Sequence, residues 1–221
     1  EWMKICIELT EMLKAKRKSV RRAAVESFGL VANVIGPQDV IYTLLQNLRA
    51  QERQNRVCTT VAVAIVAKQC GCFTILPALM NEFRVPDNNV QNGILKALSF
   101  IFEYLSTDGY YYLQSISSLI ATALANRDIV HRQIAATAMK HAVLGVEGRT
   151  DIRMLLHFTN YVWPNIYEQS PHSFFATREA IHGLHVSVGI GHTLNYLLLG
   201  LFHPARRIRE SHWDIYNGSI K

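Results

Sequence analysis

The alternation of polar and apolar positions predicts helices along the whole chain. The clearest example is Gln51–Ala67, QERQNRVCTTVAVAIVA, which opens with charged and amide side chains and then becomes almost wholly apolar. Arg53 and Val57 stand four residues apart, so they share one face of this helix. Five other stretches repeat the plan: Ser19–Ile35, Asn88–Glu103, Asp128–Val143, Ser170–Val186 and Pro204–Tyr216.

A shorter helical pattern precedes most of these stretches, with apolar residues at spacings of three and four, as in Ile41, Leu44, Leu45 and Leu48. Glycines separate the resulting pairs at intervals of roughly 35 to 43 residues, the period of HEAT or armadillo arrays. They are Gly36, Gly71, Gly109, Gly148 and Gly191. The sequence therefore predicts an all-α HEAT-repeat α-solenoid.

The predicted solenoid is a superhelix of about six helical hairpins, because a single hairpin cannot bury its apolar face alone. We expect it to be a fragment of a longer array, because terminal repeats normally carry a polar outer face and the ends of this sequence lack one. We expect one solenoid segment over residues 1–221. Its repeats are expected at 1–36, 37–71, 72–108, 109–148, 149–190 and 191–221. Pro77 and Pro164 fall within first helices, where proline is expected to cause a kink or a short break.

Composition narrows the function only slightly. The chain carries a net charge of +6 and is 49% hydrophobic. The basic excess points weakly toward an anionic partner. The four cysteines lack the spacing of a zinc site and are expected to be buried thiols in a reducing compartment. No apolar run is long enough to cross a bilayer, so no membrane role is expected.

Basic residues cluster where second helices begin, although positive charge there opposes the helix dipole at a cost of roughly 0.3 to 1 kcal/mol per group. One explanation is binding of nucleic-acid phosphates or an acidic protein. The other is bonding of the arginine within the adjacent turn, which we favour for Arg21 and Arg209 but not for Arg53 and Arg56. The predicted contacts with RNA phosphates or a partner are Arg49, Arg56, Arg127, Arg132, Arg206 and Arg207.

A candidate ligand pocket lies between two neighbouring second helices. Val90, Gly93 and Ile94 share a turn on the helix next to the one that bears Arg53 and Val57. Adjacent helices pack about 10 Å apart, so these residues could form an apolar floor for a flat purine, with a guanidinium at its edge. The alternative is equally open: Gly93 relieves helix packing and the valines belong to the core.

No pattern of residues predicts catalysis or a cofactor. His182 and His185 share a helix face and His192 follows, but no metal-binding motif accompanies them. Phosphate-binding glycine loops and nucleophile motifs are absent from the sequence. Tyr110–Tyr112 could stack on bases or contact a partner, although core packing with one exposed ring is the more ordinary interpretation. We therefore expect a protein that is not an enzyme.

Several long stretches closely resemble the C-terminal HEAT repeats of one family, the large HEAT-repeat subunit of splicing factor 3b. This subunit belongs to the spliceosomal snRNP that recognises the intron branch site. The match departs from the family pattern around Thr10–Lys18, Lys68–Cys72, Ser106–Ala125, Leu144–His157 and after Asn217, which favours a divergent organism. The matching stretches are Gln51–Ala67, Phe73–Tyr104, Arg127–Ala135, Asn160–His172 and Gly200–Asn217.

The resemblance implies a nuclear, non-enzymatic pre-mRNA splicing scaffold that holds the bulged branch adenosine and intron RNA. It implies contacts with pre-mRNA and snRNA, a small PHD-finger-like zinc protein, a large β-propeller subunit and splicing-modulator natural products. The positions that match the family's adenosine pocket are Leu45, Arg53, Val57, Val90 and Ile94. The alternative is a protein-only HEAT adaptor, of the transport-receptor or phosphatase-scaffold type, that binds acidic partners.

Overall fold

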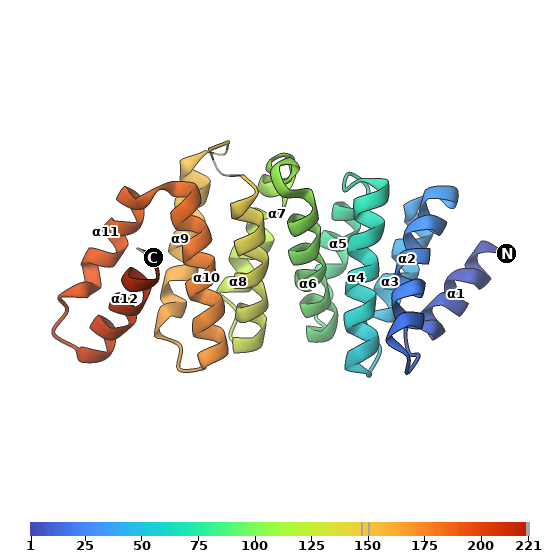
Figure 1. Cartoon of the computed structure of the whole chain (residues 1–221), viewed down its shortest axis with the longest axis horizontal. Helices are drawn as coiled ribbons and strands as arrows, with labels where there is room; N and C mark the ends of the chain where they lie inside the picture. Colours follow the sequence, from blue (N-terminus) through green and yellow to red (C-terminus); the bar gives the residue numbers. More distant parts are fainter. Residues whose placement is uncertain (147, 150, 220–221) are drawn as a thin grey trace. The chain divides into compact units, whose positions relative to one another are not determined.

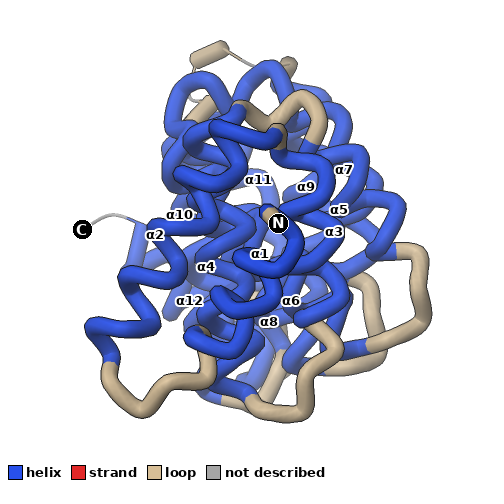
Figure 2. The backbone as a smooth tube through the Cα atoms, turned by 90° about the vertical axis from the view of Figure 1, so that its right-hand side faces the viewer, coloured by secondary structure: helices blue, strands red, loops and turns tan. Residues whose placement is uncertain are grey.

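The computed structural model describes residues 1–146, 148, 149 and 151–219. The described residues are helices joined by short loops, and none of them forms a strand (Figure 2). The predicted all-α solenoid fold is therefore confirmed. Packing divides the chain into two compact units, Glu1–Tyr104 and Leu105–Lys221. None of the described helices is both long enough and apolar enough to span a membrane.

The first unit contains three helical pairs. Its second helices α2 and α4 pack side by side, and α1 and α5 each pack against α3. Figure 1 shows α2 and α4 in front of α3 and α5, so the unit has two helical layers. The core between the layers includes Phe28, Leu44 and Leu79, which have no exposed surface. The helices are α1 (Trp2–Met12), α2 (Lys18–Ile35), α3 (Pro37–Asn47), α4 (Arg53–Cys70), α5 (Ile75–Phe83) and α6 (Asn88–Leu105).

The second unit follows the same plan, with α8 packed beside α10 and α7 packed against α9. Phe158, in α9, is fully buried in its core. Its helices are η1 (Ser106–Gly109), α7 (Tyr110–Leu124), α8 (Ile129–Leu144), α9 (Ile152–Val162), η2 (Trp163–Tyr167), α10 (Pro171–Val188), α11 (Ile190–Leu201) and α12 (Arg206–Ser219).

Glycine turns separate several helical pairs, as the sequence predicts at Gly36 and Gly71. Gly36 has φ 91°, a left-handed conformation that only glycine adopts readily, and Pro37 starts α3 directly after it. The corresponding turn before α11 is at Gly189, with φ 92°. Gly191, where the glycine spacing predicts this turn, lies inside α11.

The two prolines within first helices behave differently. Pro164 follows the end of α9 at Val162 and lies in the 3-10 helix η2, so the predicted break occurs. Pro77 does not interrupt α5, because that helix begins only at Ile75. A proline in the first helical turn removes an N–H group that would have no acceptor within the helix.

Two of the predicted repeat boundaries do not coincide with helix ends: η1 (Ser106–Gly109) crosses the boundary at 108, and α11 begins one residue before the boundary at 191. The repeat bounds stay a prediction. Residues 147, 150, 220 and 221, which belong to the last three predicted repeats, lie outside the described part of the chain. The assignment of residues 1–221 to one continuous solenoid segment stays a prediction.

Candidate functional site

A buried polar network fixes the start of α4, where Arg53 is located. Asn55 has no exposed surface. Its side-chain oxygen accepts a hydrogen bond of 3.1 Å from Nδ2 of Asn47, at the end of α3. Nδ2 of Asn47 also donates to Oγ1 of Thr59 at 2.8 Å. Because buried amides lose free energy when their partners are missing, this network holds the turn between α3 and α4 in one geometry.

The network leaves the Arg53 side chain on the surface, and Val57 one turn later is 36% exposed. Lys96 of α6 is half-buried on the adjacent helix. Burial lowers the pKa of Lys96, and the charges of Arg53 and Arg56 lower it further. Because the charges of Arg53 and Arg56 contribute to the lowered pKa of Lys96, the three side chains share a region of positive potential on α4 and α6. Lys96 was not among the residues predicted for the site, although it is the one charged residue of α6 before Glu103.

We expect an Arg53→Gln substitution to raise the pKa of Lys96, because it removes one of two repelling charges while the burial of Lys96 is unchanged. An NMR titration of the lysine Cε–Hε signals measures the shift. A Lys4→Gln variant, which removes an exposed positive charge of α1 in the same unit, is the control and should leave the pKa of Lys96 unchanged. An unchanged Lys96 pKa in Arg53→Gln would mean that the two side chains do not share a potential.

The remaining predicted pocket residues are packed in the core of this structure. Val90 and Ile94 have no exposed surface, and Leu45 is 5% exposed. Gly93 faces Leu48, since a Cβ at position 93 would come within 2.8 Å of Cδ2 of that leucine. Gly93 therefore allows close packing of α6 on the end of α3, as the alternative interpretation proposed.

The predicted pocket residues also border separate depressions. Leu45 lines a hollow of about 280 Å³ between α3 and α5, together with Ile41, Tyr42 and Ala78. Val57 lines a different hollow, between α2 and α4. Of the six pocket residues, only Arg53 and Val57 present substantial surface. A pocket that combines all six remains a prediction.

Four arginines share one structural role at the starts of second helices, and we call them the turn arginines: Arg21, Arg56, Arg132 and Arg209. Each donates through Nη1 to two carbonyl oxygens of the preceding turn, five and six residues earlier, at 2.7 to 3.0 Å. The expectation for Arg21 and Arg209 is confirmed. Arg56, for which this role was not favoured, forms the same bonds, and so does Arg132, which was predicted only as a binding residue.

The signal that could have identified them is their register. Each turn arginine lies four residues after the residue that precedes its helix: Arg17, Glu52, Asp128 and Ala205. A guanidinium at this position reaches the carbonyl groups of the turn, which would otherwise lack donors. The positive charge near the helix N-terminus is therefore offset by these hydrogen bonds.

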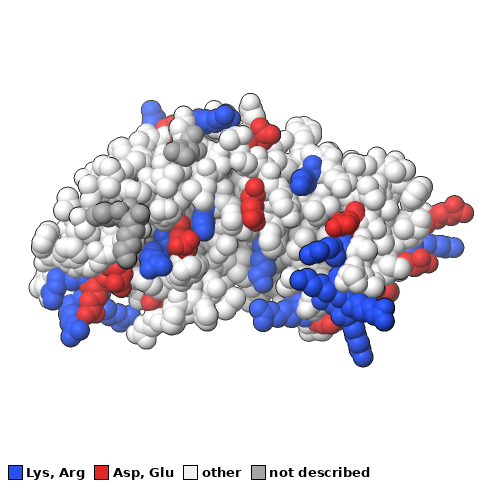
Figure 3. All heavy atoms as spheres, viewed as in Figure 1, with Lys and Arg blue, Asp and Glu red and all other residues white. Residues whose placement is uncertain are grey.

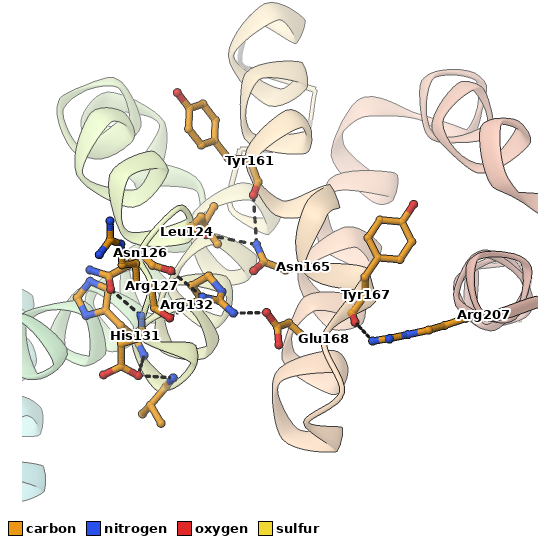
Figure 4. A network of polar contacts seen from close by, with 12 residues as sticks. Leu124, Asn126, Arg127, His131, Arg132, Tyr161, Asn165, Tyr167, Glu168 and Arg207 are labelled. Carbon is orange, nitrogen blue, oxygen red and sulfur yellow. Dashed lines mark hydrogen bonds and ion pairs between the residues drawn. The ribbon is translucent and has the colours of Figure 1, made fainter. Parts of the chain in front are cut away.

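Arg132 belongs to the larger network drawn in Figure 4. In addition to the turn carbonyls of Asn126 and Arg127, its Nη2 donates to the carboxylate of Glu168, at the end of η2. Asn165 donates from Nδ2 to the carbonyl oxygens of Leu124 and Tyr161. These bonds connect the loop before α8 to the segment before α10.

The other predicted phosphate-binding arginines differ in whether their side chains already form ion pairs or hydrogen bonds within the chain. Arg49 forms an ion pair of 2.5 Å with Glu82, and Arg206 forms one of 2.6 Å with Glu210. Arg207 donates to the carbonyl oxygen of Tyr167 at 2.8 Å. Arg127 is exposed, and no hydrogen bond of its side chain occurs within the described structure. Arg53 and Arg127 are thus the most available of the predicted cations.

The histidine and tyrosine candidates form ring contacts. The rings of His182 and His185 stack with centroids 6.4 Å apart. Among the described residues, no group of three His, Cys, Asp or Glu side chains is arranged to hold a metal ion. Tyr110 and Tyr111 meet edge to face at 5.5 Å, and Tyr111 is 74% exposed. Two exposed rings, rather than one, are available at this position.

The paired helices and the repeated turn arginines place the chain in the class of HEAT-repeat solenoid proteins, and a PPP2R1A-like HEAT-repeat family model matches residues 33–108. Within this class, nearly the whole chain is similar to components of one particle, the U2 snRNP. It is 53% identical over 219 residues to the U2 snRNP component prp10 of Schizosaccharomyces pombe. It is 46% identical over 217 residues to the U2 snRNP component HSH155 of Saccharomyces cerevisiae. The resemblance predicted from the sequence is confirmed.

The chain spans only about a fifth of these relatives, 18% of prp10 and 22% of HSH155. Solved structures support the fold. A chain from a structure of microtubule plus-end tracking by XMAP215, CLIP-170 and EB1 has a TM-score of 0.57 at 15% identity, with 96% of this chain and 90% of that chain covered. A designed armadillo repeat protein in complex with the peptide (KR)4 has a TM-score of 0.56 at 10% identity, with 96% and 98% covered.

Proposed function

We propose that this chain is a segment of a non-enzymatic scaffold of the U2 snRNP that acts in pre-mRNA splicing in the nucleus. The observation that carries this proposal is the 53% identity to prp10 over 219 residues, nearly the whole chain. A shared helical-repeat pattern alone does not explain this identity. Solved repeat proteins with the same fold are only 10 to 15% identical to this chain.

In finer detail, we propose that the scaffold helps to recognise the intron branch site. Arg53 is the best-supported contact for an RNA phosphate, since its side chain is exposed and shares a positive region with Arg56 and Lys96. Val57, one turn away, offers an apolar surface to an unstacked base. Contact with Val90 and Ile94 requires a change of conformation around α4 and α6, because both side chains are buried.

The resemblance to the splicing factor 3b family also motivates the proposed partners. These are pre-mRNA and snRNA, a small PHD-finger-like zinc protein that completes the adenosine pocket, and a large β-propeller subunit. Splicing-modulator natural products are proposed to bind at the same pocket. The pocket requires a second protein in this proposal, because this chain alone exposes only part of the predicted residues.

The test is binding of an RNA duplex with a bulged adenosine by the full-length protein together with its small zinc-protein partner. We expect Arg53→Ala to weaken binding and to reduce the salt dependence by about one phosphate contact. Val57→Phe is expected to weaken binding without changing the salt dependence. A duplex without the bulge is the control RNA. If both variants bind the bulged duplex with unchanged affinity and salt slope, the adenosine contact is not at this site.

The second candidate function is a protein-only HEAT adaptor. It is favoured by the match of residues 33–108 to a PPP2R1A-like HEAT-repeat model and by the net charge of +6. An adaptor of this kind would bind an acidic protein and would not prefer the bulged RNA to an equally charged polymer. Competition between the bulged duplex and heparin distinguishes the two functions.

A further inference from the structure

A groove runs between α2 and α4 in the first unit. Its walls are two helix faces whose residues follow the spacing i, i+3, i+4 and i+7, so each set lies along one side of its helix. The groove has a volume of about 290 Å³. The residues that line it are Lys18, Arg21, Arg22 and Val25 from α2 and Gln54, Val57, Cys58 and Val61 from α4.

The α2 wall of the groove carries positive charge, and the nearest acidic residue on α2 is Glu26, one turn after Arg22. Lys18 and Arg22 are exposed, and neither forms an ion pair or a side-chain hydrogen bond within the described structure. The guanidinium of Arg21 is held by the carbonyl oxygens of Ala15 and Lys16. Residues 15–25 contain no Asp or Glu. Figure 3 shows Lys and Arg gathered over the N-terminal ends of α2 and α4.

The floor and the opposite wall of the groove are aliphatic. Val25 and Cys58 are buried, whereas Val57 and Val61 keep part of their surface exposed. Gln54 is the only polar side chain on the α4 wall, and its Nε2 lies 3.7 Å from Sγ of Cys58. No aromatic side chain lines the groove. Single-stranded nucleic acids are generally held by bases stacked on aromatic rings, and this groove has none to offer.

We propose that the α2–α4 groove binds an acidic segment of a partner protein that carries aliphatic side chains. In this arrangement Asp or Glu side chains of the segment pair with Lys18 and Arg22, and a Leu, Ile or Val side chain fills the space over Val25, Val57 and Val61. The combination of a charged edge and an apolar floor is the pattern by which amphipathic helices dock in grooves. Phosphates alone would use the charged wall and leave the aliphatic floor exposed to water.

This proposal shares Val57 with the RNA contacts proposed above. It does not use Arg53, and none of the substitutions below changes Arg53 or Val57. The test uses the full chain and a short fluorescein-labelled peptide of Glu, Ala and Leu in which Leu residues are four apart. A matched peptide replaces each Leu by Gln, and a labelled oligouridylate carries the same net charge. Fluorescence anisotropy gives the affinity for each probe at about 50 and 200 mM salt.

We expect the Glu/Leu peptide to bind at least about tenfold more tightly than the Glu/Gln peptide. Lys18→Glu combined with Arg22→Glu should weaken its binding by about tenfold or more. Val61→Asn should weaken the Glu/Leu peptide but not the oligouridylate. Lys4→Glu, a charge reversal at an exposed position of α1, is the matched control and should change the affinity less than twofold.

Two results would overturn the proposal. Equal affinity for the two peptides would mean that charge alone attracts them. Tighter binding of the oligouridylate, dependent on Lys18 and Arg22 but not on Val61, would assign the groove to the RNA backbone. Circular dichroism of each variant separates loss of binding from loss of folding. Because Arg53 is intact in all these proteins, the bulged-adenosine assay can succeed or fail independently.

Discussion

Gly145→Ala is expected to lower the free energy of unfolding of the second unit by roughly 1 to 3 kcal/mol. Gly145 follows α8 with φ −70° and ψ −15°, a conformation that alanine adopts readily. The cost comes from space: a Cβ at this position would lie 2.2 Å from the carbonyl oxygen of Ser106. That atom belongs to the backbone at the start of η1, so it cannot move without shifting the segment that enters α7.

The effect is measured by urea unfolding, with hydrogen exchange of the α7 and α8 amides to locate it. Gly191→Ala is the matched control. Gly191 lies inside α11, and no atom would lie within 4 Å of an added Cβ. This control should be neutral or stabilising by up to about 1 kcal/mol, because alanine favours helix more than glycine does. A Gly145→Ala chain as stable as the Gly191→Ala chain would show that η1 is not packed against the end of α8.

Arg132→Ala is expected to destabilise the second unit by about 2 kcal/mol or more. The side chains of Arg132 and Glu168 are only 14% and 28% exposed. The substitution leaves the Glu168 carboxylate and the turn carbonyls of Asn126 and Arg127 without their donor (Figure 4). Arg132→Lys should recover only part of the loss, because an ammonium group cannot reproduce the planar fork that reaches all three acceptors.

Thermal and urea unfolding measure this effect, and Arg127→Ala serves as control because Arg127 is an exposed neighbour. A surface substitution of this kind usually changes stability by less than about 0.5 kcal/mol. If Arg132→Ala were as mild as Arg127→Ala, the turn carbonyls would be satisfied by water and Arg132 would be available to a ligand. The same comparison can be made with Arg56, whose bonds to Ala50 and Gln51 are equivalent.

The candidate site was predictable from the sequence only in part. Helical spacing predicts that Arg53 and Val57 share one face of their helix, and the structure shows that both residues keep exposed surface. The burial of Val90 and Ile94 does not follow from helical spacing. Both residues belong to α6, which is apolar on more than one side, so the sequence could not decide which side faces the core. Packing of Leu48 against Gly93 decides it.

Helical spacing also could not predict which arginines remain free to bind a partner. Arg49 is paired with Glu82 of α5, and Arg132 with Glu168 beyond α9. In each pair the partner lies about one repeat further along the chain. The repeat period indicates that such positions are neighbours, but whether two long side chains meet depends on the rotation of each helix and on the length of the turn. The sequence therefore could not show which of the predicted arginines already have a partner within the chain.

The sequence by itself determined the paired helices, their order, the turn at Gly36, the break at Pro164 and the hydrogen bonds of Arg21 and Arg209. These features depend on spacing and backbone preference within a few residues, which the sequence specifies directly. Only the tertiary structure decided which apolar faces are buried, which arginines retain free donors and where the α2–α4 groove lies. Those outcomes depend on how side chains from separate helices share the space between them, and helical periodicity carries no information about that.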